Sequence, residues 1–154
     1  MKEKELVLKL KEKNMKIATA ESCTGGMIAS RIVNVPMASS VFDESIVTYS
    51  NEAKIKYLKV KEETIEKFGV VSEEVVKEMA EGIAKASGAN VGIGVSGIAG
   101  PTGATETKPV GMVCFGFYIN GEIFAFTKYF KGSRMTVRKK STKFAICKVL
   151  ELIK

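Results

Sequence analysis

The stretch Met15–Val33 reads MKIATAESCTGGMIASRIV and contains a strand, a glycine turn and a helix in immediate succession. Met15–Ala20 has the short apolar run of a buried strand, and Met27–Val33 has the small and aliphatic residues of a packed helix. A strand that leads directly into a helix is the repeating unit of folds in which helices cover a sheet. This stretch therefore predicts an α/β protein.

The rest of the chain supports this class and adds an antiparallel edge. The dipeptide Asn120-Gly121 lies between two long apolar segments, which is a strong signal for a two-residue hairpin. Early strands that alternate with helices favour parallel pairing, so we expect a single-domain, three-layer α/β/α fold with a mixed sheet. The further predicted strands are Ile46–Tyr49, Val91–Val95, Val110–Ile119 and Glu122–Phe130, and the further predicted helices are 2–13, Glu52–Leu58, 72–87 and Met135–Ile153.

Length and composition bound the class of protein. The chain has 154 residues, of which 45% are hydrophobic and 27% are charged, as expected for one globular domain spanning residues 1–154. No apolar stretch approaches the roughly 18 residues of a membrane span, and the charged N-terminus lacks the apolar core of a secretion signal. We therefore expect a cytoplasmic domain without membrane contact.

The absence of histidine excludes several kinds of catalytic site. A Ser-His-Asp or Cys-His arrangement is impossible, as are histidine-rich zinc sites, so a general base must be Lys, Asp, Glu, Tyr or Cys. Cys23, Cys114 and Cys147 are odd in number and widely spaced, which argues against a disulfide framework and a structural metal site.

Positive charge is concentrated near the C-terminus. The net charge is +7, and the segment 123–150 holds eight basic residues and no acidic one. Such a segment suits an anionic partner, although a solvated lysine-rich helix face explains it equally well. Arg134, just before the predicted last helix, and Arg138 are spaced i and i+4, so they would share a face and could grip one phosphate together.

Ser22 is a candidate nucleophile. It follows the first strand, and Thr24, Gly25 and Gly26 lead into the next helix, where backbone N–H groups can approach an oxyanion or a phosphate. Two alternatives remain open on the residues alone. Ser22 or Thr24 could simply cap the helix, and Cys23 could be the nucleophile if the helix N-terminus lowered its pKa.

Without histidine, the natural base for a serine nucleophile is a desolvated lysine. No serine begins a Ser-x-x-Lys motif, so the pair must come from separate segments. Lys54 and Tyr49 flank the start of the helix that follows the second strand, which makes this segment the best donor. On its own, Lys54 would be interpreted as a surface lysine.

The match of residues 92–97 to GxGxxG is rejected as a dinucleotide-binding motif. Gly92 and Gly94 lie inside a predicted strand, and a Gly/Pro-rich loop follows where that motif needs a helix. Small residues in a buried strand explain the match.

Four motifs in order resemble the C-terminal domain family of the competence/damage-inducible protein CinA. They are AESCTGG at 20–26, VTYSNEAK at 47–54, GVSGIAGPTG at 94–103 and KPVG at 108–111. The pattern Gly-x-Arg-x-x-Val-Arg at 132–138 also matches, with Ser133 where the family usually has Asp.

The resemblance implies an amidase. Stand-alone members hydrolyse the carboxamide of nicotinamide mononucleotide to nicotinate mononucleotide and ammonia, by a Ser–Lys mechanism that needs no metal or cofactor, and they are commonly homodimers. Carried over by motif, Ser22 is the nucleophile, Lys54 the base and Tyr49 a residue that places the substrate. Ser96, beside Gly97, lines the pocket, and Arg138 contacts the nucleotide phosphate.

The same residues also fit functions other than nicotinamide mononucleotide hydrolysis. A nucleotide-binding or regulatory relative would keep the pocket and lack turnover, and another amide or a dinucleotide could be the substrate. Nucleic-acid binding by the basic segment is disfavoured, because Tyr129, Phe130 and Phe144 are explained as core residues rather than exposed stacking platforms.

Overall fold

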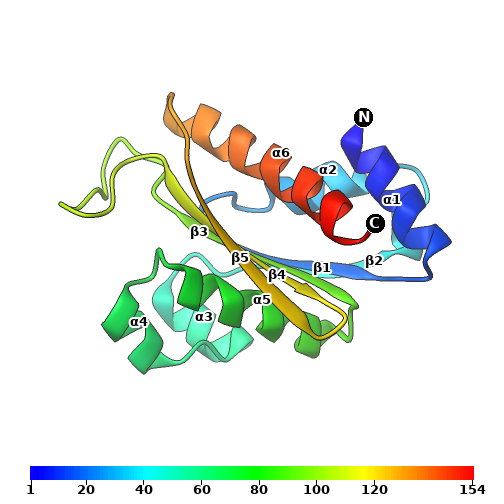
Figure 1. Ribbon diagram of the computed structural model, residues 1–154, viewed down its shortest axis with the longest axis horizontal. Coiled ribbons are helices and arrows are strands. Elements are labelled where there is room, and N and C mark those ends of the chain that lie inside the picture. Colours follow the sequence, from blue (N-terminus) through cyan, green and yellow to red (C-terminus); the bar gives the residue numbers. More distant parts are fainter.

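The computed structural model describes all 154 residues and shows a five-stranded sheet between two layers of helices (Figure 1). The strand order is β2-β1-β3-β4-β5, in which β1 pairs in parallel with β2 and β3, and the β3–β4 and β4–β5 pairs are antiparallel. The predicted three-layer fold with a mixed sheet is confirmed. The strands are β1 (Ile17–Glu21), β2 (Phe42–Val47), β3 (Val91–Gly97), β4 (Met112–Ile119) and β5 (Glu122–Tyr129).

The helices divide between the two faces of the sheet. On one face, α1, α2 and α6 pack together over a large apolar cluster that includes Ile17, Ile93 and Phe115 (Figure 1). On the other face, α5 covers the sheet, with α3 and α4 beside it. No helix combines the length and apolar character that a membrane crossing requires. The helices are α1 (Lys2–Glu12), α2 (Met27–Val33), α3 (Asn51–Leu58), α4 (Glu62–Phe68), α5 (Glu73–Ser87) and α6 (Arg134–Leu152), with a 3-10 turn at Ala38–Ser40.

Close packing of α5 explains the glycines of the rejected dinucleotide motif. Both Gly92 and Gly94 lie within β3, as predicted, and a Cβ atom at either position would overlap the backbone of α5. Gly116 on β4 meets the same helix, where a Cβ would overlap the carbonyl of Val76. These glycines let a helix lie directly on the sheet and need no ligand.

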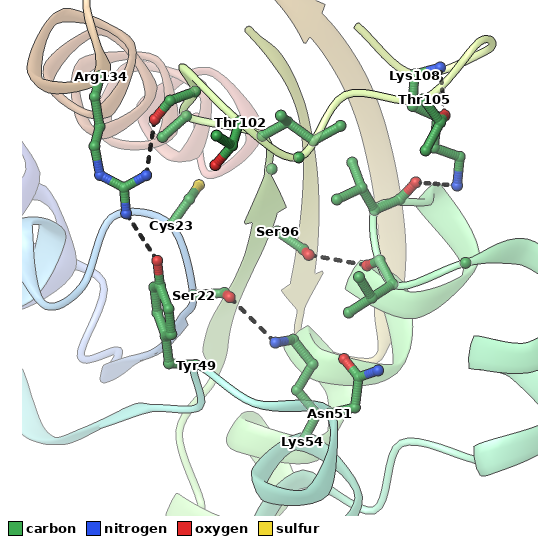
Figure 2. A pocket seen from close by; sticks show the side chains of 18 residues that line it. Ser22, Cys23, Tyr49, Asn51, Lys54, Ser96, Thr102, Thr105, Lys108 and Arg134 are labelled. Carbon is green, nitrogen blue, oxygen red and sulfur yellow. Dashed lines mark hydrogen bonds between the residues drawn. The ribbon is translucent and has the colours of Figure 1, made fainter. Parts of the chain in front are cut away.

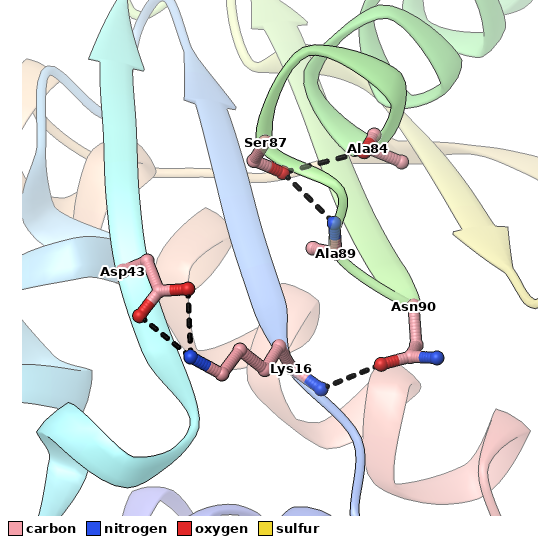
Figure 3. Close-up of polar contacts among 6 residues, drawn as sticks. All are labelled: Lys16, Asp43, Ala84, Ser87, Ala89 and Asn90. Atoms are coloured by element: carbon pink, nitrogen blue, oxygen red, sulfur yellow. Dashed lines mark hydrogen bonds and ion pairs between the residues drawn. The ribbon is translucent and has the colours of Figure 1, made fainter.

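Polar contacts fix the amino-terminal ends of the parallel strands (Figure 3). The Nζ atom of Lys16, just before β1, donates to both carboxylate oxygens of Asp43 at 2.9 and 2.8 Å, and its backbone N–H donates to Asn90 Oδ1 at 2.8 Å. The first contact joins β1 to β2 and the second joins β1 to the start of β3. These contacts lie at the amino-terminal ends of the strands and leave the carboxyl ends of the same strands open.

Several predicted boundaries differ from the structure. The second strand was predicted at Ile46–Tyr49 but runs from Phe42 to Val47, so Tyr49 lies beyond it. Helix α4 was not predicted, because its seven residues bury only Thr64 and show no apolar period. The first hairpin strand begins at Met112 rather than Val110, since Gly111 turns the chain with φ of 92°.

Candidate functional site

A cavity of about 520 Å³ opens at the carboxyl ends of β1, β2 and β3. Its walls come from residues 22–23 after β1, 49–54 after β2, 69–71 between α4 and α5, 96–108 at the end of β3 and in the loop that follows, and Arg134 at the start of α6 (Figure 2). Parallel strands place their ligand sites at this edge, because the loops that leave the strands converge there. No acidic residue lines the cavity, whereas three cationic side chains do.

Ser22 lies where β1 leaves the sheet. Its backbone N–H donates to the carbonyl of Val95 on β3 at 3.1 Å, so the residue continues the strand pairing by one position. The residue is 8% exposed, and its side chain faces the cavity (Figure 2). The hydroxyl is therefore held by strand geometry while one side stays open to a ligand.

Lys54 reaches Ser22 from α3. Ser50 caps this helix by accepting a hydrogen bond from the Ala53 N–H, which sets Lys54 on the side facing the cavity. The Lys54 Nζ donates to Ser22 Oγ at 3.1 Å and to the Thr48 carbonyl at 2.7 Å. Only 1% of Lys54 is exposed, and no carboxylate lies against its amine.

Burial changes the acid–base behaviour of Lys54. Desolvation of the ammonium lowers the pKa of Lys54 from 10.5 to about 8. The amine is then partly neutral at pH 7 to 8, and only a neutral amine can take a proton from a serine hydroxyl. A serine beside a desolvated lysine is thus chemically able to act as a nucleophile with its base.

The backbone of Thr48 links the two side chains. Its N–H donates to the Glu21 carbonyl at 2.9 Å, and its own carbonyl accepts the Lys54 hydrogen bond. The base is therefore oriented by a third group that is fixed to the residue just before the nucleophile. This is the arrangement expected when a nucleophile, its base and an orienting acceptor act as one unit.

Cys23 lines the cavity but does not have the properties of a nucleophile. The thiol is buried, and desolvation raises the pKa of Cys23 to about 12. A thiolate is the reactive form, so this thiol stays protonated near neutral pH. The alternative in which the helix N-terminus lowers the thiol pKa is contradicted, because burial dominates.

Thr24, Gly25 and Gly26 lie outside the cavity. The Gly25 N–H donates to the Ser22 carbonyl and the Gly26 N–H donates to the Glu21 carboxylate, so neither is free for an oxyanion. Neither Ser22 nor Thr24 caps α2, because Gly26 holds the N-cap position and Glu21 satisfies the helix amides. Cys23, Ala99 and Gly100 line the cavity, and their backbone N–H groups have no acceptor in the chain.

The two arginines that were expected to act together point to different places. Arg134 lines the cavity and donates to the Gly100 carbonyl and to the Tyr49 hydroxyl, both at 2.8 Å (Figure 2). Arg138 does not line it and donates instead to the carbonyls of Cys23 and Thr24, at 2.8 and 3.2 Å. The predicted phosphate contact of Arg138 is thus not supported by its position, because its guanidinium binds backbone carbonyls and does not line the cavity.

The remaining predicted residues lie in the cavity wall. Tyr49 is 62% exposed at the rim, and Gly97 ends β3 beside the cavity. The Ser96 hydroxyl donates to the Val70 carbonyl at 2.9 Å, so this serine joins β3 to the α4–α5 turn. Because its only hydroxyl hydrogen is donated to Val70, Ser96 can only accept a hydrogen bond from a ligand.

Lys108 was not predicted as a site residue, although the KPVG motif contains it. Its Nζ donates to the carbonyls of Phe68 and Val71, both at 2.6 Å, and thereby ties the long loop after β3 to the α4–α5 turn (Figure 2). The KPVG motif could have indicated a role for Lys108. Its partners could not be predicted, because helix α4, whose last residue supplies the Phe68 carbonyl, was not predicted. Ser133, where the family usually has Asp, caps α6 by accepting from the Thr136 N–H.

The fold and the site define a mixed α/β protein with a buried serine–lysine pair at the carboxyl ends of its parallel strands. The family model of the CinA C-terminal domain matches residues 1–153, and the chain belongs to that family. The resemblance inferred from the motifs is thereby confirmed.

Individual relatives agree. A CinA-like protein of Petrotoga mobilis is 52% identical over 138 residues, which cover 90% of this chain and 34% of that protein. A putative competence-damage inducible protein of Clostridium botulinum is 54% identical over 129 residues, covering 84% of this chain and 32% of that protein. This chain thus spans about a third of the length of the curated relatives it matches. A crystal structure of a CinA superfamily protein from Klebsiella pneumoniae has a TM-score of 0.96 at 33% identity, covering 99% of this chain and 95% of that one.

Proposed function

We propose that this protein hydrolyses the carboxamide of nicotinamide mononucleotide to nicotinate mononucleotide and ammonia. The observation that carries the proposal is the 3.1 Å contact between Ser22 Oγ and the buried Lys54 amine, whose pKa is lowered to about 8. A cavity of about 520 Å³ is within the range of roughly 300–1,000 Å³ usual for small-molecule sites. Its cationic, acid-free lining favours a substrate that carries a phosphate.

The reaction would begin with attack of Ser22 on the amide carbon. Neutral Lys54 takes the hydroxyl proton as the Oγ–carbon bond forms, and the carbonyl oxygen becomes an oxyanion. The free N–H groups of Cys23, Ala99 and Gly100 are the donors available for that charge. The tetrahedral intermediate then expels the nitrogen, which receives the proton from Lys54 and leaves as ammonia.

Hydrolysis of the ester completes the cycle. A water molecule attacks the acyl carbon while Lys54 again accepts the proton, and the Ser22 oxygen leaves with that proton restored. Arg134 replaces Arg138 as the side chain proposed to meet the substrate phosphate, since it lines the cavity and pairs only with neutral oxygens. Tyr49 is proposed to place the substrate at the rim.

The direct test is an assay of purified protein with nicotinamide mononucleotide, in which ammonia and nicotinate mononucleotide are both measured. Ser22→Ala and Lys54→Met should lose release, whereas Cys23→Ala should keep it. Addition of a chelator checks the proposed independence from metal. Folded wild type that binds the mononucleotide without releasing ammonia would instead be a binding or regulatory relative.

The expected homodimer is tested separately. The resemblance implies it, and sedimentation equilibrium of the purified chain measures it directly. A monomer at micromolar concentration would contradict this part of the proposal.

A further inference from the structure

Glu21 is a buried carboxylate directly behind the nucleophile. It is the last residue of β1, it is 0% exposed, and no lysine or arginine pairs with it. A buried charge without a counter-ion is costly unless hydrogen bonds compensate it. Five donors do so: Thr24 Oγ1 (2.7 Å), Gly26 N (3.1 Å) and Ile28 N (3.0 Å) to Oε1, and Thr19 Oγ1 (3.0 Å) and Ala29 N (3.0 Å) to Oε2.

These donors lie on both sides of Ser22 in the sequence. Thr19 belongs to β1, before the nucleophile, and the other four belong to the turn and the first helical turn after it. One side chain therefore ties the end of the strand to the start of α2 across the residue that lies between them. The first backbone N–H groups of α2 donate to the Glu21 carboxylate, so they are not available to a ligand in the cavity.

The backbone of Glu21 also connects to the base. Its carbonyl accepts the Thr48 N–H, and the Thr48 carbonyl accepts the Lys54 amine. A shift of Glu21 would consequently move the nucleophile and the group that orients its base together.

We propose that Glu21 is a positioning residue, whose carboxylate holds the Ser22 turn so that Oγ stays within hydrogen-bond distance of the Lys54 amine. The proposal rests on the proposed hydrolase function only in its kinetic readout, because the geometry concerns Ser22 and Lys54 themselves. Glu21 does not line the cavity, so its effect is exerted through the turn.

Glu21→Gln keeps the shape of the side chain and removes one acceptor. Backbone N–H groups approach both carboxylate oxygens, so the amide nitrogen of glutamine faces at least one N–H donor in either orientation. That donor loses its acceptor and the start of α2 has to move. A displacement near 1 Å costs about 100-fold in rate at a catalytic centre, so we expect kcat to fall about 100-fold with KM nearly unchanged.

A fluorophosphonate probe tests the positioning without the nicotinamide substrate. Ser22 Oγ attacks phosphorus, the phosphorus–fluorine bond breaks, fluoride leaves, and Lys54 takes the hydroxyl proton. The control is Ile83→Ala, which removes a fully buried side chain of α5 from the apolar cluster on the α5 face of the sheet and so lowers stability without touching the turn. Both variants are compared with wild type at a temperature where circular dichroism shows all three folded.

We expect Glu21→Gln to label about 100-fold more slowly than wild type and Ile83→Ala to label at the wild-type rate. A folded Glu21→Gln protein with wild-type labelling and kcat would overturn the proposal and leave Glu21 a purely structural residue. If Glu21→Gln does not fold, Thr24→Val decides, since it removes one donor to the carboxylate and should slow labelling about tenfold. Wild-type labelling by that variant would equally overturn the proposal.

The same experiment separates this inference from the proposed function. Wild type that labels at Ser22 but releases no ammonia from nicotinamide mononucleotide contradicts the amidase proposal alone, and the labelling rates still decide the role of Glu21. Wild type that does neither has no active nucleophile to position, and both proposals then fail.

Discussion

Replacement of Lys54 by Met should make the stability difference between the two proteins depend on pH. Methionine has nearly the shape of the lysine stem and carries no charge to desolvate. In the folded wild type the pKa of Lys54 is lowered from 10.5 to about 8 by burial. In the unfolded chain the same group keeps its ordinary value.

The magnitude follows from proton linkage. Below pH 8 both states of the wild type hold the proton, and the folded state carries the full cost of a buried ammonium. Between pH 8 and 10.5 the folded state has lost the proton while the unfolded state retains it, so stability rises with pH. The difference of about 2.5 between the two pKa values corresponds to about 3 kcal/mol in total.

The assay is urea denaturation of wild type and Lys54→Met at several pH values from 7 to 10.5. Taking the difference cancels groups that titrate alike in both proteins. We expect the free energy of unfolding of wild type to gain about 3 kcal/mol on that of the variant across this range. Lys56→Met, which removes an exposed lysine of the same helix, controls for the loss of one charge.

A flat difference curve between pH 7 and 10.5 would refute the reasoning. It would mean that Lys54 has the same pKa in the folded and unfolded states, and the amine could not act as a base near neutral pH. A curve that falls with pH would mean that an unseen anion stabilises the ammonium.

Three further predictions follow from individual side chains. Lys59 directly follows α3 as its C-cap with φ of 59°, so Lys59→Gly should relieve about 1 kcal/mol of strain and raise Tm by a few degrees in calorimetry; an unchanged Tm would contradict this. Arg134→Gln should raise KM for nicotinamide mononucleotide but not for the riboside, because Arg134 lines the cavity where the phosphate is proposed to bind. Arg138→Gln should lower kcat with little change in KM, because Arg138 binds the Cys23 and Thr24 carbonyls next to the nucleophile. The reverse pattern would return the phosphate contact to Arg138. At pH 8 iodoacetamide should leave Cys23 unmodified, because burial raises its pKa to about 12, and should modify the half-buried Cys147; peptide mass mapping that finds Cys23 alkylated first would contradict the assignment.

Much of the fold was predictable because its signals are local. The strand, glycine turn and helix of Met15–Val33 and the Asn120-Gly121 hairpin are each encoded within a few residues. The location of Gly92 and Gly94 within a strand could also be predicted. Why glycine is needed at these two positions could not. That reason is the direct contact of α5 with the sheet, which depends on two elements at once.

Part of the site was predictable in the same sense. The position of Ser22 after a strand and the absence of histidine already favoured a serine with a lysine base. Lys54, however, would pass for a surface lysine in the sequence of α3. Its amine is buried because α3 places it against residues 32 positions earlier in the chain, and only that placement lowers its pKa.

The sequence by itself therefore determined the α/β class, the order of elements and the family, since these follow from local propensities and from motifs that stand in order. Only the tertiary structure decided that Arg134 rather than Arg138 faces the cavity, that Cys23 keeps its proton, and that Glu21 uses up the amides of α2. The physical reason is the same in each case. Burial and hydrogen-bond partners come from segments far apart in the chain, and a spacing along one helix does not specify what its side chains will meet.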